Sequence, residues 1–207
     1  MSPSTTAGTG SSAGPTSLRR LLVMGAPGSG KRTQSGALAQ RLGLAALSTG
    51  DLFRAVMTYD TPVGARVRDA VGHGGYVDDE TTDAAFDQEF GDDRFRPGFL
   101  LFGYPRTAAQ AEHLDQVLAR EHAVLDAVVC LSVADDTLVD RLLGRAQELH
   151  RIDDQAETIR PRLALYHQTT EPLLDLYRDR GLLLEVDGTG TVDVVAGRID
   201  SALQRTS

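Results

Sequence analysis

The chain of 207 residues has one cysteine, Cys130, and one lysine, Lys31. A single thiol excludes both an internal disulfide framework and a zinc site built from several cysteines. No apolar run approaches the roughly 20 residues that are needed to cross a bilayer. The first 17 residues lack the basic start and apolar centre of a secretory signal. We therefore expect a cytoplasmic protein.

Positive charge is also scarce, because 21 basic residues stand against 29 acidic ones and leave a formal charge of -8. That balance disfavours proteins whose main task is to coat nucleic acid or an anionic membrane, so we expect neither as a partner. Twenty of the basic residues are arginine. The one lysine stands in a glycine-rich loop, where a compact ammonium group is hard to replace by a guanidinium.

The pattern from residue 18 onward predicts one α/β domain over residues 18–207, preceded by a disordered tail at 1–17 that is rich in Ser, Thr, Gly and Pro. Short apolar runs predict buried strands at 21–24, 45–47, 98–101, 127–131 and 182–186. Helical spacing predicts helices at 33–42, 51–71 (broken near Pro62), 81–90, 108–120, 137–149, 156–180 (interrupted near Pro172) and 192–203. Strands that alternate with helices in this way indicate a parallel sheet with helices on both faces.

The glycine-rich segment GAPGSGKRTQ, residues 25–34, follows the first predicted strand and opens the first predicted helix. Glycines let successive backbone N–H groups turn inward around phosphate oxygens at a helix N-terminus, and Lys31 would reach the terminal phosphates of a nucleoside triphosphate. A strict phosphate-loop pattern has Ser or Thr directly after the lysine, where this chain has Arg32. The plain alternative is a turn that merely joins strand to helix.

This loop resembles the G-x-P-G-x-G-K-G-T-Q loop of adenylate kinases, which are nucleoside monophosphate kinases, except at Arg32. Further blocks similar to that family follow in order: STGDL at 48–52 with Arg54, GFLLFGYPRT at 98–107 with Gln110, RLLGR at 141–145, RIDD at 151–154, RPRL at 160–163 and VDGT at 186–189. The resemblance covers about residues 20–200. It implies a P-loop NTPase-type sheet with a small helical monophosphate-binding lobe at 48–77, a short lid at 145–151 and a monomeric enzyme.

The resemblance also implies roles for individual residues. The residues expected at ATP are Gly28, Ser29, Gly30, Lys31, Arg32, Thr33, Arg141 and Arg145. The residues expected at AMP are Thr49, Arg54, Gly75, Tyr76, Val77, Gly103, Tyr104, Pro105, Arg106, Gln110, Arg151 and Arg162. The residues expected to act in catalysis are Lys31, Arg106, Arg145, Arg151 and Arg162. The planar donors of arginine suit a bidentate grasp of phosphate oxygens as charge shifts during transfer.

Several of these residues also have a purely structural interpretation. Any single arginine is usually solvated or ion-paired, and for Arg141 the two interpretations are balanced. Tyr76 and Val77 are nearly as well explained by packing of a small lobe. Asp51 is better explained as the cap of the helix that follows it than as a ligand. The acidic pair at 153–154 is expected to hold lid arginines.

Two departures from the family's pattern fall at positions that serve Mg²⁺. The family's aspartate at the end of the 98–101 strand holds water ligands of the metal, and here it is Phe102. The small residue after the loop lysine is here Arg32. Fewer carboxylates and an added cation should weaken support for Mg²⁺ with the nucleotide. Either Arg32 replaces part of the metal's charge while stacking on Phe102, or Arg32 points to solvent and Phe102 simply packs.

The expected function is reversible transfer between ATP and AMP to give two ADP, with ATP, AMP and ADP as partners. One alternative is a catalytically weakened nucleotide-binding homologue with a regulatory role, for which the two departures are the only support. A second alternative is a kinase for a different nucleoside monophosphate, with faint support from Tyr104, where the family commonly has Phe.

Overall fold

The computed structural model describes residues 19–72, 77–149 and 156–205, so the tail predicted at 1–17 lies outside the described part. Its centre is a five-stranded parallel sheet in the order β2-β3-β1-β4-β5. The strands are β1 (Arg20–Gly25), β2 (Ala45–Ser48), β3 (Phe99–Phe102), β4 (Ala127–Ser132) and β5 (Leu183–Asp187). This arrangement confirms the predicted fold class. Within the described residues, no helix is both long and apolar enough to cross a membrane.

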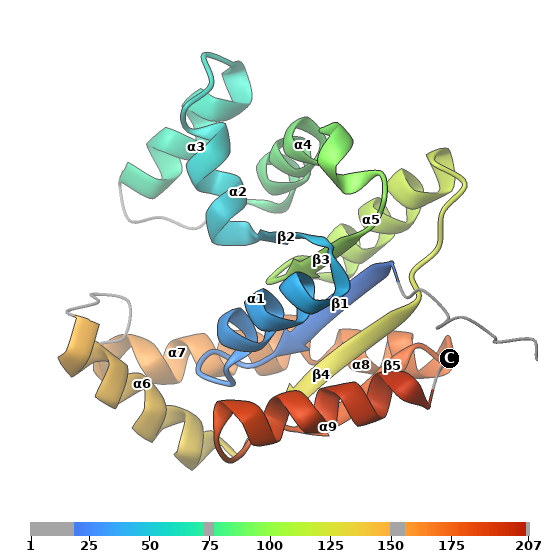
Figure 1. Ribbon diagram of the computed structural model, residues 1–207. Coiled ribbons are helices and arrows are strands. Elements are labelled where there is room, and N and C mark those ends of the chain that lie inside the picture. The colour runs from blue at the N-terminus through green and yellow to red at the C-terminus, as the bar shows by residue number, and fades with distance from the viewer. Residues whose placement is uncertain (1–18, 73–76, 150–155, 206–207) are drawn as a thin grey trace, which may run out of the picture.

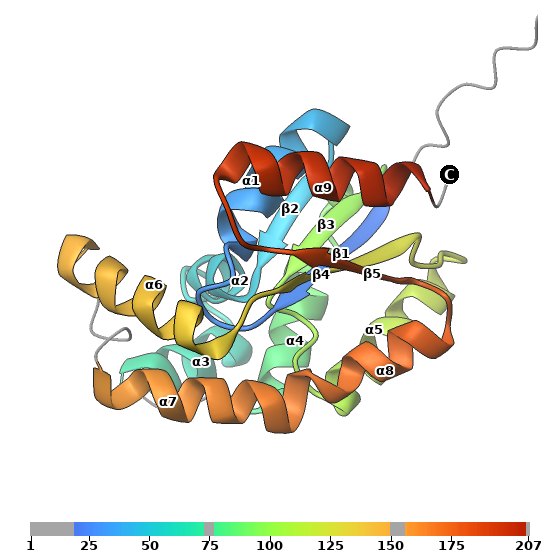
Figure 2. The same cartoon turned by 90° about the horizontal axis from the view of Figure 1, so that it is seen from below.

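Helices cover both faces of the sheet, as Figures 1 and 2 show. The α-helices are α1 (Lys31–Leu42), α2 (Thr49–Val56), α3 (Pro62–Gly72), α4 (Asp79–Phe90), α5 (Ala108–Arg120), α6 (Asp135–Leu149), α7 (Ala156–Leu165), α8 (Pro172–Asp179) and α9 (Val192–Gln204). Helices α1 and α9 lie on one face, whereas α5 and α8 lie on the other (Figure 2). Near the carboxyl ends of the strands, α2 and α3 project on one side and α6 and α7 on the other (Figure 1).

The period-two alternation of the strands divides the core between these faces. Leu22 and Met24 pack with the side chains of α5 and α8, whereas Leu21 and Val23 pack with those of α1 and α9. In β3 the same alternation directs Phe102 toward the α1 face. The end of β3 therefore meets the start of α1 at the edge of the sheet where the loop after β1 lies.

Helices α1, α4 and α6 each begin two residues before the predicted start, and two further local features differ from the sequence expectation. The helix predicted from residue 51 begins at Thr49, and its N-cap is Ser48, whose side chain accepts a hydrogen bond from the backbone N–H of Asp51. The interpretation of Asp51 as the cap was therefore wrong, because Ser48 still has the extended backbone of β2. The predicted interruption near Pro172 is a π-helical turn, η3 (Tyr166–Thr170), and a short 3₁₀ turn, η1 (Asp93–Phe95), precedes β3.

We expect Tyr177→Phe to stabilise the protein. Tyr177 is fully buried in the core, and within the described part of the chain its hydroxyl has no hydrogen-bond partner. Removing an unsatisfied hydroxyl should raise the free energy of unfolding by about 1 kcal/mol. The matched control is Tyr104→Phe, which removes a buried hydroxyl that donates to Asp83 Oδ1 at 2.7 Å and should lower that free energy by about 1 kcal/mol. Urea denaturation of both variants would contradict the expectation if Tyr177→Phe proved the less stable.

Candidate active site

The loop between β1 and α1 is shaped by glycines in left-handed backbone conformations. Gly28 has φ +85°, and a Cβ there would lie 3.1 Å from Leu142 Cγ and 3.2 Å from the Leu138 carbonyl oxygen. The loop therefore packs directly against α6. Gly30, with φ +94°, is the N-cap of α1. The free N–H groups and positive dipole end of α1 consequently face the same side as the loop, which is the ordinary arrangement for binding an anion.

Lys31 begins α1, and its ammonium group turns back over this loop. Its Nζ donates to the carbonyl oxygens of Gly25 at 2.6 Å and Ala26 at 2.7 Å. Burial, and then the positive charge of Arg106, lower the pKa of Lys31 to about 7. The ammonium is thus poised to lose its proton near neutral pH unless a negative group joins it.

A cleft of about 670 Å³ opens beside the loop, and we call it the arginine cleft. Its described lining includes six basic residues and no carboxylate. The basic residues are Lys31, Arg32, Arg106, Arg141, Arg145 and Arg162. In a chain of net charge -8, such a concentration marks the cleft as a binding site for a ligand with several negative charges.

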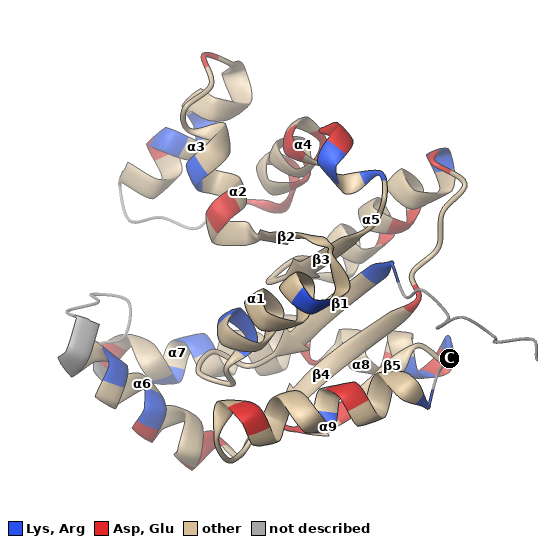
Figure 3. Ribbon diagram, viewed as in Figure 1, with Lys and Arg blue, Asp and Glu red and all other residues tan. Residues whose placement is uncertain are grey.

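The guanidinium groups that line the arginine cleft come from four places in the fold, and Arg32 comes from α1. Arg141 and Arg145 are four residues apart and therefore share one face of α6. Arg162 comes from α7, and basic segments on α6 and α7 are visible as blue ribbon in Figure 3. Arg106 comes from the turn after β3. Because these elements are far apart in sequence, the fold itself assembles the cationic lining.

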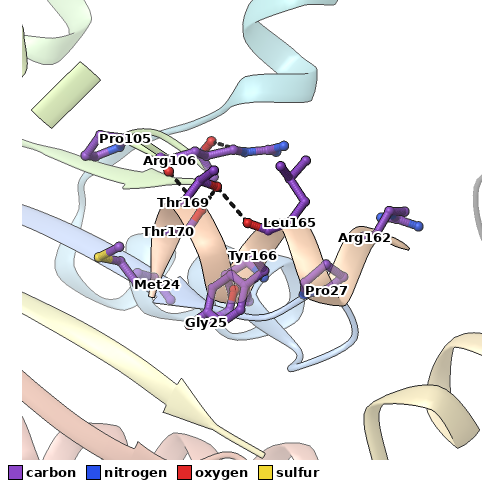
Figure 4. A pocket seen from close by; sticks show the side chains of 13 residues that line it. Met24, Gly25, Pro27, Pro105, Arg106, Arg162, Leu165, Tyr166, Thr169 and Thr170 are labelled. Atoms are coloured by element: carbon purple, nitrogen blue, oxygen red, sulfur yellow. Dashed lines mark hydrogen bonds between the residues drawn. The ribbon is translucent and has the colours of Figure 1, made fainter. Parts of the chain in front are cut away.

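A smaller cavity of about 180 Å³ adjoins the cleft and shares Lys31, Arg106 and Arg162 with it. We call it the π-turn cavity because η3 forms one of its walls (Figure 4). In that wall, the Thr170 hydroxyl donates to the carbonyl oxygen of Arg106 at 2.9 Å. This contact ties η3 to the turn that carries Arg106, and π-helical turns are often found at functional sites.

The backbone and side chain of Arg106 are held from several directions. Its Nε donates to the Gly103 carbonyl oxygen at 2.7 Å, and its backbone N–H donates to Gln110 Oε1 at 2.8 Å. The hydroxyl of Thr49, at the start of α2, donates to the same Gly103 carbonyl. The guanidinium group of Arg106 is therefore held in place at the cleft before a ligand binds. The same turn is linked to the start of α2 through Thr49.

Arg32 and Phe102 lie together at the mouth of the arginine cleft. The Arg32 guanidinium carbon lies 6.0 Å from the centroid of the Phe102 ring, at the outer limit of a cation–π contact. Its Nη2 lies 3.9 Å from Asp51 Oδ1, and its side chain is 63% exposed. The contact between Arg32 and Phe102 that the first alternative requires is therefore present, while most of the arginine side chain remains in water, as the second alternative expects.

Asp51 lies beside Arg32, and its carboxylate is already engaged. It forms an ion pair with Arg54 and accepts a hydrogen bond from Ser48. Burial acts to raise the pKa of Asp51, but these hydrogen bonds and the charge of Arg32 outweigh it and hold that pKa below its ordinary value. Arg54 and Arg32 both lie beside Gly50, which lines the arginine cleft.

The structure places the remaining predicted residues as follows. Gly28, Gly30, Thr33, Thr49 and Gly103 line the arginine cleft, and Pro105 lines the π-turn cavity. Ser29 is buried within the loop, and Val77 and Tyr104 are buried in the core. Gln110 is buried behind the Arg106 turn. Gly75, Tyr76, Arg151 and the acidic pair at 153–154 lie outside the described residues.

Sequence reasoning missed the contribution of η3. Leu165, Tyr166, Thr169 and Thr170 line the π-turn cavity, yet the sequence marks this stretch only by the proline that follows it. It also missed Ser48 and Gly50 in the lining of the arginine cleft. Both residues belong to the block STGDL. Their position, where a strand ends and a helix begins, was the signal that could have indicated them.

Comparison with known proteins bears on what such a cleft does. The sequence profile of the adenylate kinase family matches residues 23–182. The chain is 43% identical over 187 residues to an adenylate kinase of Pseudarthrobacter chlorophenolicus, covering 90% of this chain and 97% of the relative. It is 46% identical to adenylate kinases of a Nocardioides species and of Clavibacter michiganensis, over 89% and 90% of this chain and 96% and 93% of those relatives.

Proposed function

The chain belongs to the adenylate kinase family and is a phosphotransferase of the nucleoside monophosphate kinase type, and we propose that its arginine cleft carries out the reaction ATP + AMP = 2 ADP. The observation that supports this role for the cleft is the convergence of six basic side chains on the N-terminus of α1. Phosphoryl transfer requires little covalent chemistry from the protein, so positioning and charge stabilisation supply most of the catalysis.

ATP is proposed to bind over the loop at 28–33. The loop N–H groups and Lys31 would take its phosphates, while Arg141 and Arg145 on α6 would approach from the opposite side. Lys31 already sits over the loop, held by two carbonyl oxygens that an incoming phosphate can replace as partners. The energy of that exchange is favourable because an ammonium–phosphate contact joins full charges, whereas a carbonyl supplies only a dipole.

AMP is proposed to bind on the side of the Arg106 turn, with Thr49, Arg54 and Gln110. Arg106 and Arg162, which line both the cleft and the adjoining cavity, are suited to the oxygens of the transferring phosphoryl group. Arg151 is proposed for the same task by resemblance to the family. No residue is assigned as an obligatory general base.

The described residues do not fit a metal ion held by protein carboxylates. The cleft lining has six cations and no carboxylate, and nowhere in the described chain do three or more His, Cys, Asp or Glu side chains converge as a metal site. Adenylate kinases generally use Mg²⁺ with their nucleotides, but the roles proposed above involve side chains and backbone groups of this chain alone. We propose that Arg32, placed by Phe102 and Asp51, supplies part of the positive charge beside the phosphates.

We propose further that residues 48–77 form the monophosphate-binding lobe and 145–151 a short lid, and that closure of both excludes water during transfer. A cytoplasmic monomer is proposed as the working form. The names of the relatives favour AMP as the acceptor over the two alternatives, a regulatory homologue and a kinase for another monophosphate.

The decisive test measures ADP formation from ATP with each nucleoside monophosphate in turn, using the full-length chain. We expect AMP to be the best acceptor. The bisubstrate mimic Ap5A should bridge both subsites and raise the melting temperature. Binding of ATP or AMP without ADP formation would support the regulatory alternative, and a better acceptor than AMP would support the other one.

The affinity for ATP should depend on pH through Lys31. Its pKa of about 7 in the free protein must rise when phosphate joins it, so binding takes up a proton at alkaline pH. Affinity should therefore be level below about pH 7 and fall by up to about tenfold per pH unit above it. Calorimetry from about pH 7.5 to about pH 9.5, in buffers of different ionisation enthalpy, measures the proton uptake directly. A slope that persists unchanged in Lys31→Met would assign the effect to another group.

A further inference from the structure

Asp79, at the start of α4, connects that helix to the turn that carries Arg106. Both of its carboxylate oxygens are engaged. Oδ1 accepts from Gln110 Nε2 and Oδ2 from the Thr107 hydroxyl, each at 2.7 Å. Thr107 is the N-cap of α5 and in turn accepts a hydrogen bond from the backbone N–H of Gln110. One acidic side chain of α4 thus holds the first turn of α5.

The carboxylate also determines which way the Gln110 carboxamide faces. Gln110 is 2% exposed, and its Oε1 accepts from the backbone N–H of Arg106. Because a carboxylate can only accept, Asp79 requires the amide nitrogen of Gln110 on its own side and leaves the oxygen for Arg106. Among the residues that the structure describes, one N–H and one lone pair of the carboxamide then have no partner.

This connection differs from the other contacts between α4 and the core. Asp83 and Asp87 follow Asp79 at four-residue intervals and therefore share a face of α4, whose acidic segments are red in Figure 3. Asp83 accepts from the Tyr104 hydroxyl at 2.7 Å, and Asp87 lies 2.8 Å from His113 Nε2. Asp79 alone among these three bonds a side chain that reaches the backbone of Arg106.

We propose that Asp79 is a positioning residue for the acceptor nucleotide. Acting through Gln110, it holds the Arg106 turn and presents the free amide N–H and oxygen of Gln110 in one fixed orientation. An adenine edge offers the complementary acceptor and donor. The inference rests on the proposed transfer to AMP. It adds that Asp79 sets the affinity for AMP without touching AMP.

The test compares Asp79→Asn with Asp87→Asn, the matched control on the same helix face. Asp79→Asn keeps the shape of the side chain but lets the Gln110 carboxamide turn over, which also disturbs Arg106. We expect the KM for AMP to rise about tenfold or more, because a hydrogen bond to a charged group is lost. The KM for ATP should change by less than about twofold, because the loop at 28–33 is untouched. Asp87→Asn should leave both KM values unchanged.

A second variant covers the case in which Asp79→Asn does not fold. In the exchanged pair Asp79→Asn with Gln110→Glu, the carboxylate introduced at position 110 accepts from Arg106 and from the amide introduced at position 79, so the turn is held again. The exchanged pair should regain thermal stability and lose the preference for AMP over other monophosphates, because a carboxylate has no N–H for the base.

Equal rises in the KM for AMP and for ATP would overturn the role of Asp79. An exchanged pair that retains the preference for AMP would overturn the contact between Gln110 and the base, through which Asp79 is proposed to act. Failure of the proposed function looks different, because wild type and Asp87→Asn would then both make no ADP. Activity in those two proteins, together with an unaltered KM for AMP in Asp79→Asn, would reject only the positioning role.

Discussion

Substitution of Lys31 by methionine is expected to lower turnover on the order of a thousandfold, which is the scale of losing a preorganised charge at a transferring phosphoryl group. Lys31 is the only lysine in the chain and the only ammonium in the cleft lining that the structure describes. We do not expect the neighbouring arginines to take over, because Nζ sits over the loop between two carbonyl oxygens, where a compact ammonium is hard to replace by a broad, planar guanidinium. A coupled assay of ADP formation measures the loss.

The control for this variant is Arg41→Met, which removes a basic group from the same helix. Arg41 pairs with Asp200 on α9, outside the arginine cleft, and its removal should leave turnover within about twofold of wild type. AMP affinity by calorimetry should persist in Lys31→Met, since the Arg106 side of the cleft is intact. A variant that retains more than about a tenth of wild-type turnover would remove Lys31 from the centre of the mechanism.

The sequence predicted the sheet well because each strand is a short, mostly apolar run, and β1, β3 and β4 are buried along nearly their whole length. All five predicted strands are present, and each end lies within one residue of its prediction. Helix α5 was predicted with its observed bounds, since Thr107 provides a clear N-cap signal and the apolar spacing is regular. The prediction succeeded where the local sequence alone determines the local structure.

The contacts in the site that join residues far apart in the sequence could not be predicted from the local sequence pattern. Gln110 was predicted from resemblance to face the base, but the sequence did not indicate that its carboxamide also donates to Asp79, 31 residues earlier in the chain. Similarly, Thr170 donates to the carbonyl oxygen of Arg106 across 64 residues. Nothing in the local pattern around either residue specifies a partner at that distance, because such pairings follow from how the helices pack.

Substitutions of Arg32 and Phe102 are expected to change how the binding of ATP depends on metal. In the wild type, the guanidinium beside the loop should let ATP bind with appreciable affinity when a chelator removes divalent ions. In Arg32→Gly, that metal-free affinity should fall about tenfold or more, because a charge-assisted contact to phosphate is lost. Calorimetry with and without the chelator separates this loss from any effect on turnover.

Phe102→Asp alone should not improve the use of metal. The new carboxylate would lie on the α1 face beside Arg32 and would pair with it, as Asp51 now does at 3.9 Å. It would also lower the free energy of unfolding by about 3 kcal/mol, because Phe102 is 8% exposed and packs in the core with Leu21 and Leu100. Phe102→Leu is the matched control, since it loses the ring without adding charge.

The double variant Arg32→Gly with Phe102→Asp removes the cation and adds a carboxylate, so the two charge changes act together. Relative to Arg32→Gly, it should bind ATP more tightly when Mg²⁺ is present and more weakly when Mg²⁺ is absent, each by about tenfold. The informative result is that ATP affinity rises with Mg²⁺ and falls without it, since a loss of stability alone would weaken ATP binding in both conditions. If Arg32→Gly leaves metal-free ATP affinity unchanged, Arg32 is a solvent-facing side chain and Phe102 serves only to pack β3 against α1.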